Sequence, residues 1–478
     1  MRISRLHVIA IFLAIWAAGA NAGETSTLTT IYSFSGPDGA NPAGLLQGAD
    51  GNFYGTTSAN SIADTHPPGW ANFGTVFRIT PEGALTNLHV FSGASDGAWP
   101  QAGLVQTANG SFYGTTYGRG AHGWGTVFWI SPAGDFKTFA SFDSSHGWTE
   151  ARLIQGSDGN FYTMGNQYLG SGFGTVVRVA PDGAPAVLVP FDGVNGYTAY
   201  DGNPLLQGAD GNIYGATELG GPAFTGKYYN PGYGTLFKIT PEGKFTSLFR
   251  FNGANGFYAT ALVQGADGSL YGTTSQGGLG FVDNPQWGGS GGHGTIFKLT
   301  LNGVFTTLAL FDGANGERPL SLMQARDGNF YGATARGGAD GGYGTIFRMT
   351  ADGALTSLFS FNRTNGASPY FDPLLEAADG SFYGTTTAGG ASNRGTIFRL
   401  TIAPGPPAFD NVSRTGDAVT FTWAALTGRF YQVQHKGDLT QSTWSDLGNP
   451  VIATNNTMSL SDVIGPDRRR FYRVMLLP

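Results

Sequence analysis

The stretch DGNFYGTT (Asp50–Thr57) restricts the fold of this chain more than any other feature, because close copies of it recur through most of the sequence. Seven copies occur, and each carries a tyrosine at the same position. These tyrosines are Tyr54, Tyr113, Tyr162, Tyr214, Tyr271, Tyr331 and Tyr383. Successive tyrosines lie 49 to 60 residues apart. The chain is therefore a tandem array of similar structural units.

Each repeat unit contains four short runs that are rich in β-branched and aromatic residues and are bounded by turn residues. In the first unit they are AGLLQG (Ala43–Gly48), the motif itself, GTVFRIT (Gly74–Thr80) and ALTNLHVF (Ala84–Phe91). We expect these runs to form strands A to D of an antiparallel sheet. The 77 glycines and the low charged fraction of 12% favour strands and turns over helices. Four-stranded sheets repeating at this interval are typical of β-propeller blades.

The number of strands indicates how the array closes. Strands A, B and C each occur seven times, whereas strand D follows only six of the C strands. An additional D-like run, LTTIYSFSG (Leu28–Gly36), precedes the first A strand. If this run completes the last sheet, no sheet edge stays open. The sequence therefore predicts an all-β fold, a seven-bladed β-propeller closed by an N-terminal strand.

The two ends of the chain differ from the repeats. Arg2 and Arg5 precede an apolar run (Val8–Ala18) and a small-residue ANA site (Ala20–Ala22), which is the pattern of a secretory signal peptide. We therefore expect residues 1–22 to be removed. The product would be secreted or at the cell surface, with the periplasm as an alternative. No second long apolar run follows, so we expect no membrane span.

After the propeller, which we place at residues 23–402, the Pro-rich segment TIAPGPPAFDNV (Thr401–Val412) marks a linker. Residues 403–478 alternate in strand fashion over at least five short runs. This pattern predicts a small C-terminal β-sandwich. We expect Trp423 and Tyr431 to lie in its core.

The combination DGNFYGTT, GTVFRIT and LTNLHVF resembles the Gloeo/Verruco tandem repeat of bacterial choice-of-anchor surface proteins, over about residues 28–401. The resemblance implies a surface-associated repeat protein and assigns no activity. The C-terminal module resembles a fibronectin type III-like β-sandwich.

We interpret the repeated motif itself as a structural element. Asp-Gly and Asn-Gly supply the positive φ that hairpin turns require. The motif aspartate recurs with a basic residue on strand C, and unit 2 lacks both, with Asn109 and Trp129 in their places. We therefore expect an ion pair between them. One carboxylate per turn falls short of a calcium site; we predict no cofactor, with calcium as the alternative.

The end of strand A carries a second repeated polar group. It is Gln47, Gln106, Gln155, Gln207, Gln264 and Gln324 in six units, and Glu376 in the seventh. We expect the amides to satisfy backbone groups around the channel.

Function is expected where units depart from the repeat, on the long D–A and B–C connections of one face. Aromatic and cationic side chains there suit stacking on sugar rings or gripping a peptide. With a net charge of -6 and no basic run, nucleic acid is excluded as a partner. We predict a monomer that binds a glycan or an extracellular protein. The candidate ligand-binding residues are Trp99, Trp124, Trp148, Arg152, Tyr200, Trp287 and Arg318.

Two alternatives stay open. A polysaccharide lyase or glycoside hydrolase would use the same face, with His146, Glu150, Arg152 and Asp201 as catalytic candidates. A structural envelope protein would have neither a ligand nor an activity. The motif copy that departs most, DGNFYTMG (Asp158–Gly165), lies in the same unit as the first three of these candidates.

Overall fold

The structure is a computed structural model. It describes residues 25–58, 73–149, 151–167, 172–198, 205–221, 224, 232–282, 290–339, 341–369, 372–403, 407–425, 429–454, 457–464 and 470–477. The predicted signal peptide (1–22) and four candidate site residues, Glu150, Tyr200, Asp201 and Trp287, lie outside these ranges. The described residues form strands and turns and contain no helix.

The chain divides into two compact units. One spans Leu28–Thr401, and the residues from Ile402 onward belong to the other. The sequence-based boundary between residues 402 and 403 lies one residue further along the chain.

Seven sheets of four or five strands follow one another through the described part of the first unit, and we number them in chain order. Sheet 1 consists of β2 (Pro42–Gln47), β3 (Phe53–Thr57), β4 (Thr75–Ile79) and β5 (Leu85–Val90). Sheet 2 consists of β6 (Val105–Gln106), β7 (Phe112–Thr116), β8 (Thr126–Ile130) and β9 (Phe136–Ser141). Sheet 3 consists of β10 (Ile154–Gln155), β11 (Phe161–Gly165), β12 (Thr175–Val179) and β13 (Pro185–Pro190). Sheet 4 consists of β14 (Leu205–Gln207), β15 (Ile213–Thr217), β16 (Thr235–Ile239) and β17 (Phe245–Arg250).

The remaining sheets of this unit are slightly more elaborate. Sheet 5 consists of β18 (Phe257–Gln264), β19 (Leu270–Gln276), β22 (Thr295–Leu299) and β23 (Phe305–Leu310). A separate pair, β20 (Phe281–Val282) and β21 (Ser290–Gly291), lies between β19 and β22 in sequence. Sheet 6 consists of β24 (Glu317–Pro319), β25 (Met323–Gln324), β26 (Phe330–Arg336), β27 (Thr345–Met349) and β28 (Leu355–Ser360). Sheet 7 consists of β29 (Ala367–Pro369), β30 (Leu375–Glu376), β31 (Phe382–Ala388), β32 (Thr396–Ala403) and the N-terminal β1 (Thr25–Ser33).

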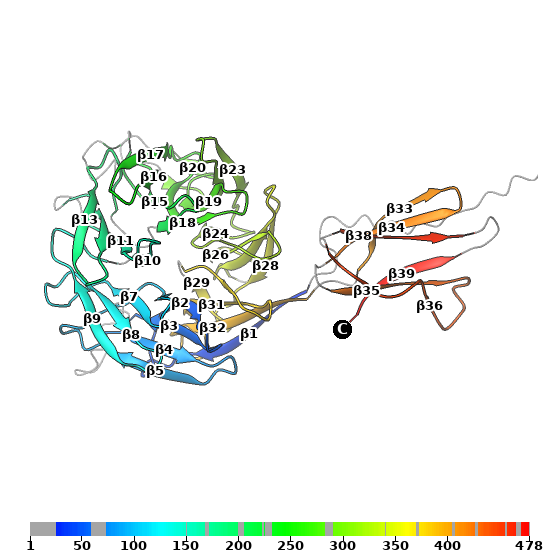
Figure 1. Cartoon of the computed structure of the whole chain (residues 1–478), viewed down its shortest axis with the longest axis horizontal. Coiled ribbons are helices and arrows are strands. Elements are labelled where there is room, and N and C mark those ends of the chain that lie inside the picture. The colour runs from blue at the N-terminus through cyan, green and yellow to red at the C-terminus, as the bar shows by residue number, and fades with distance from the viewer. Residues whose placement is uncertain are drawn as a thin grey trace, which may run out of the picture. The chain divides into compact units, whose positions relative to one another are not determined.

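The sheets are arranged around a common centre, with the first strand of each sheet inside and the last at the rim (Figure 1). The second and third strands are buried on both faces, as β3 and β4 illustrate, because a neighbouring sheet covers each side. The rim strand β5 is only partly buried. β1 is the rim strand of sheet 7 and pairs with β32, so the first strand of the chain completes its last repeat.

Neighbouring sheets pack through the motif tyrosine and the apolar residue that precedes it in the motif. At most junctions the tyrosine of one sheet contacts the phenylalanine of the next, as Tyr54 and Phe112 do with ring centroids 4.2 Å apart. Ile213 and Leu270 take the place of the phenylalanine in sheets 4 and 5. The same contact joins sheet 7 to sheet 1, where Tyr383 and Phe53 are 4.4 Å apart. Burial of these large aromatic side chains between sheets supplies much of the apolar core.

The strand-A glutamines also connect neighbouring sheets. The Nε2 group of Gln207 donates to the carbonyl of Gly211 in its own turn, while its Oε1 accepts the N–H of Ser157 in sheet 3 at 2.8 Å. Gln264 and Gln324 repeat this arrangement. Glu376 replaces the amide in sheet 7, where its Oε2 accepts the N–H of Arg326 at 2.9 Å. The expected backbone role is therefore confirmed for these positions.

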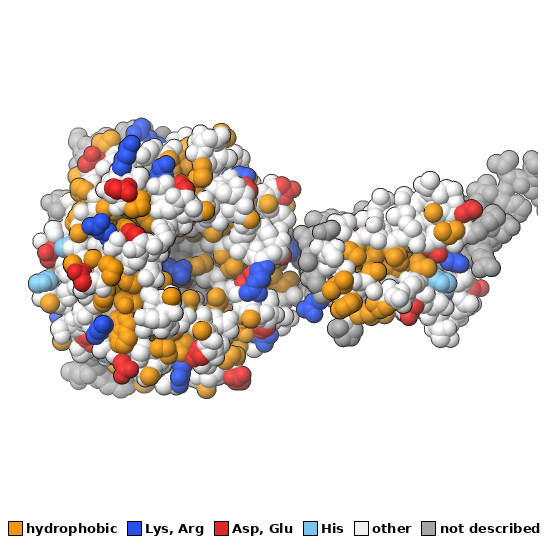
Figure 2. Space-filling view, viewed as in Figure 1, with side chains coloured by type: hydrophobic (Ala, Val, Ile, Leu, Met, Phe, Trp, Pro, Cys, Tyr) orange, Lys and Arg blue, Asp and Glu red, His pale blue; other side chains and the backbone are white. Residues whose placement is uncertain are grey.

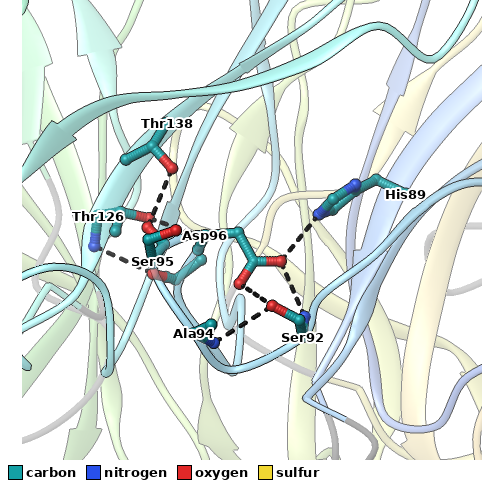
Figure 3. A network of polar contacts seen from close by, with 8 residues as sticks. His89, Ser92, Ala94, Ser95, Asp96, Thr126 and Thr138 are labelled. Carbon is teal, nitrogen blue, oxygen red and sulfur yellow. Dashed lines mark hydrogen bonds and ion pairs between the residues drawn. The ribbon is translucent and has the colours of Figure 1, made fainter.

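The turn that leads from one sheet to the next docks against the next sheet. Asp96 accepts hydrogen bonds from the N–H and hydroxyl of Ser92, and its Oδ2 lies 3.3 Å from Nε2 of His89 (Figure 3). Thr126 of β8 donates to the carbonyl of Asp96. His89 in turn stacks on Phe136 of β9 at 3.6 Å. These contacts fix where the connection from sheet 1 to sheet 2 begins.

The C-terminal unit contains two sheets. One consists of β33 (Phe409–Thr415), β34 (Ala418–Ala424) and β38 (Thr457–Val463); the other consists of β35 (Phe430–Lys436), β36 (Ser445–Asp446), β37 (Val451–Ile452) and β39 (Phe471–Leu476). Side chains from both sheets share a core that includes Trp423, Tyr431 and Val474. Trp423 and Tyr431 are 0% and 2% exposed, so their prediction as core residues is confirmed.

Candidate functional site

Each sheet of the first unit has two ends. The turn end carries the motif turn, residues 48–52 in sheet 1. The loop end carries the longer connections, which include Phe73, Trp99, Tyr117, Trp124 and Trp148 in sheets 1 to 3.

At the turn end, the main partner of the motif aspartate is the motif tyrosine. Asp50 accepts a hydrogen bond from the hydroxyl of Tyr54 at 2.8 Å. It also accepts hydrogen bonds from the backbone N–H and the side-chain amide of Asn52. Asp158, Asp210, Asp267 and Asp327 accept their own tyrosine hydroxyls at 2.6 to 3.0 Å. The strand-C base lies directly across from the tyrosine, as Arg78 does from Tyr54. The predicted aspartate–base pairing is therefore wrong as the general rule.

Ion pairs between the aspartate and the base do form in sheets 5 and 7. Lys298 lies 2.7 Å from Asp267, and Arg399 lies 2.9 Å from Asp379. In sheet 2, where Trp129 replaces the base, the ammonium of Lys137 lies 5.1 Å from the Trp129 ring and provides the cation instead.

The pKa values at the turn end reflect this dense set of donors. Burial works to raise the pKa of Asp267, but hydrogen bonds from Lys298, Ser269 and Tyr271 outweigh it and lower this pKa to about 2. Burial, together with the hydrogen bond to Asp50, raises the pKa of Tyr54 to about 12. Despite burial, the pKa values of Asp50, Asp158 and Asp210 are also lowered by hydrogen bonds within their turns, which indicates a structural role for these carboxylates.

The odd motif copy in sheet 3 has a packing explanation. The other six copies end in a threonine that bonds the threonine opening the next strand, as Thr57 does with Thr75 at 2.8 Å. Sheet 3 has Gly165 instead, and a Cβ there would lie 1.8 Å from the carbonyl oxygen of His146. Thr175 donates to that oxygen at 2.5 Å. Gly165 therefore makes room for the backbone at His146.

His146, the candidate base, is a turn residue. Its Nδ1 lies 2.7 Å from Oδ1 of Asp143, and its ring packs on Phe142. In the equivalent turn after β13, the side-chain oxygen of Asn195 accepts the N–H of Asp192, and the N–H of Asn195 donates to Oδ1 of Asp192. His146 is thus engaged by its own loop.

The loop end brings three of the predicted ligand-binding residues into one group. The rings of Phe73, Trp99, Tyr117, Trp148 and Trp124 contact one another in that order, with centroids 4.1 to 6.3 Å apart. We call this group the aromatic strip. All five side chains are partly exposed, whereas most of the motif's aromatic rings between the sheets, such as those of Tyr54 and Phe112, are buried. The strip spans the loops of sheets 1 to 3.

Arg119 adds a cation to the aromatic strip. Its guanidinium carbon lies 5.5 Å from the ring of Phe73 and 5.9 Å from that of Trp99. Arg119 is exposed and has φ +65°, an uncommon backbone conformation for a residue with a side chain. Phe73, Tyr117 and Arg119 were missed by the sequence analysis, although each adjoins a strand end of the loop face.

The two predicted arginines lie in different places. Arg152 is exposed and directly precedes the inner strand of sheet 3. Arg318 belongs to β24 of sheet 6, where its N–H donates to the carbonyl of His293 and its Nε is buried without a partner. Burial, with the nearby charge of Arg336, lowers the pKa of Arg318. Arg318 and the aromatic strip therefore belong to separate sets of loops.

A carboxyl that the sequence analysis also missed lies beside Arg152. Asp372, just before β30, accepts the N–H of Gly103 from sheet 2 at 3.2 Å. Burial raises its pKa, against the opposing effects of Arg152 and the Gly103 N–H. Among the described residues, no three His, Asp or Glu side chains gather to hold a metal ion. Nor does that part of the chain include a helix able to cross a membrane.

Comparisons with known proteins add the following. No curated protein matches the chain. The fold is similar to the PQQ-bound form of an aldose sugar dehydrogenase from Streptomyces coelicolor, at 15% identity and a TM-score of 0.42, over 79% of this chain and 99% of that one. It is also similar to a protein of unknown function from Dyadobacter fermentans, at 12% identity and a TM-score of 0.42, over 80% and 100% of the two chains.

The repeat gives a firmer result. Residues 21–229 and 230–421 each match the Gloeobacter/Verrucomicrobia repeat, and together these matches cover most of the chain. The protein therefore belongs to the Gloeobacter/Verrucomicrobia repeat family.

Proposed function

We propose that this chain is a secreted or cell-surface binding protein, built as a closed seven-bladed β-propeller, that recognises a glycan at the loop end of sheets 1 to 3. The pairing of β1 with β32 and the packing of Tyr383 on Phe53 support the closed ring. A protein ligand at the same face is the alternative.

The aromatic strip is the observation that carries this proposal. Aromatic rings on rigidly held loops present apolar faces that can stack on the C–H face of a sugar ring. Phe73 and Trp124 pack against core clusters at one side of the strip, and the row of partly exposed rings that they form with Trp99, Tyr117 and Trp148 supports an interaction surface. Arg119 places hydrogen-bond donors beside that surface for sugar hydroxyl or acidic groups.

Binding is favoured over catalysis by the contacts of His146. The lyase alternative used His146, and its ring nitrogen is engaged by Asp143 within its own turn. The hydrolase alternative used Glu150 and Asp201, which lie outside the described residues. We propose that binding needs no metal, so EDTA treatment should leave it unchanged.

A glycan array with purified protein tests the proposal. Trp148→Ala and Tyr117→Ala should each weaken binding about fivefold or more, because each removes one ring of the strip. Trp129→Ala is the matched control, since this partly exposed tryptophan lies at the turn end of sheet 2. Absence of binding across the array, or equal losses in all three variants, would contradict glycan recognition by the strip.

A further inference from the structure

Four inner-strand segments of the first unit converge where Arg152 and Asp372 lie. Gly44 is in β2, and Gly103, Arg152 and Asp372 lie within three residues of β6, β10 and β30. These are inner strands of sheets 1, 2, 3 and 7 (Figure 1). The centre of this unit is hollowed, and Lys or Arg atoms lie beside the hollow (Figure 2).

Two glycines form a cradle for the carboxyl group of Asp372. A Cβ on Gly44 would lie 2.6 Å from Cγ of Asp372, and a Cβ on Gly103 would lie 2.8 Å from its Oδ1. Gly44 also has φ +40°, a conformation that favours glycine. Because Gly44 and Gly103 have no side chains, sheets 1 and 2 leave a space at this point. The side chain of Asp372, from sheet 7, occupies that space.

Arg152 is the exception in its repeat position. It stands three residues before Gln155, where sheets 1 and 2 have Gly44 and Gly103. Its side chain is exposed and makes no hydrogen bond or ion pair with the described residues. It interacts electrostatically with Asp372, yet the two do not form an ion pair. Within the described residues, the guanidinium of Arg152 thus has no hydrogen-bond or ion-pair partner and lies near enough to the Asp372 carboxyl to interact with it electrostatically.

This arrangement stabilises the fold poorly. Among the described residues Asp372 accepts one hydrogen bond, and burial of its carboxyl group raises its pKa despite this bond and the charge of Arg152. A structural pair would bring Arg152 into contact with it, as Arg399 contacts Asp379 at the turn end. Polar groups that are positioned but left without partners are typical of binding sites.

We propose that Arg152 and Asp372 form a binding site for an acidic sugar, in which Arg152 binds the carboxylate of a uronate and Asp372 bonds a neighbouring hydroxyl. This inference rests on the proposed glycan-binding function and names its ligand class. A planar guanidinium matches a carboxylate with two parallel hydrogen bonds. The second oxygen of Asp372 has no hydrogen bond within the described residues and is left for a sugar hydroxyl.

The test uses the full chain and a panel of oligouronates (galacturonate, glucuronate, mannuronate and guluronate), each compared with its carboxyl-reduced counterpart by calorimetry. We expect at least one oligouronate to bind more tightly than its neutral counterpart. Arg152→Gln should weaken that binding about tenfold or more, because it removes the charge-assisted pair. Arg178→Gln, the same change at the turn end of sheet 3, is the matched control and should bind as the unaltered protein does.

A second variant tests the cradle without touching a ligand-binding group. Gly103→Ala adds a Cβ that displaces the Asp372 carboxyl, so it should also weaken oligouronate binding while Arg152 stays in place. If no oligouronate binds better than its neutral counterpart, or if Arg152→Gln binds like Arg178→Gln, the acidic-sugar site is wrong. The proposed glycan-binding function would still hold in that case if the protein binds a glycan and Trp148→Ala abolishes this binding. If the protein shows neither oligouronate binding that depends on Arg152 nor glycan binding that depends on Trp148, both proposals are overturned.

Discussion

At the turn end of the sheets, the repeated aspartates are surrounded by hydrogen-bond donors. Near the loop end, Asp372 accepts one backbone N–H among the described residues and interacts with Arg152 only electrostatically. The pKa of Asp267 is lowered to about 2, and that of Asp372 is raised. The same side-chain type thus stabilises the fold in one region and opposes it in the other. The difference teaches that the repeated positions are scaffold and that the departures from the repeat are where ligand binding is to be sought.

The largest expected effect is a loss of stability when the packing between sheets is disrupted. Phe112 is fully buried and stacks on Tyr54 between sheets 1 and 2. Phe112→Ala should destabilise the first unit by about 3–5 kcal/mol, because it leaves a cavity between sheets. Thermal or denaturant unfolding would show this loss. A loss no greater than that of Trp148→Ala in the aromatic strip would contradict the division into scaffold and site.

Gly165→Thr restores the repeat consensus in sheet 3, yet it should destabilise. The new side chain would clash with the carbonyl of His146, which Cβ would approach to 1.8 Å. Overpacking of this kind costs about 1–3 kcal/mol. An increase in melting temperature would show instead that Gly165 is not a packing adaptation.

The link between sheets 6 and 7 predicts a smaller difference between two variants. Glu376→Ala leaves the N–H of Arg326 without its acceptor and should cost about 1–2 kcal/mol. Glu376→Gln keeps an acceptor and loses only a long ion pair to an exposed arginine, at 3.9 Å. Glu376→Gln should therefore lower the free energy of unfolding by less than about 1 kcal/mol. Equal unfolding free energies for the two variants would argue against the inter-sheet hydrogen bond.

Much of the scaffold could be predicted from sequence because its signals are local and repeated. The four strands of each unit, the turn glycines and the Phe-Tyr contacts all follow from residues within one repeat. The prediction of an aspartate–base pair was wrong as a general rule because each motif aspartate has two possible partners, the strand-C base and the motif tyrosine. The hydroxyl of the tyrosine four residues on lies within reach in most sheets, and the coincidence of Asn109 with Trp129 pointed to the base instead.

The candidate site could be predicted only in part. Trp99, Trp124 and Trp148 stand out as aromatic departures in loops, and the structure places them in one strip. Asp372 gave no such signal, because its neighbours Gly44, Gly103 and Arg152 are more than 200 residues away in sequence. Only the arrangement of sheets around a centre brings these four residues together.

The most direct test compares two isosteric changes, Asp372→Asn and Asp267→Asn, by melting temperature as a function of pH. The folded-state pKa of Asp372 is raised, so its ionised form lowers stability at neutral pH and this penalty disappears as pH falls towards the unfolded value of about 4. Asp267 has a lowered pKa, so its contribution is present above that value and is lost as pH falls through about 2.

At neutral pH, Asp372→Asn should therefore raise the melting temperature, and Asp267→Asn should lower it by an amount equivalent to less than about 1 kcal/mol. The gain from Asp372→Asn should vanish on acidification. A melting temperature lowered by both changes would show that Asp372 is another structural carboxylate, and it would contradict the contrast between scaffold and site.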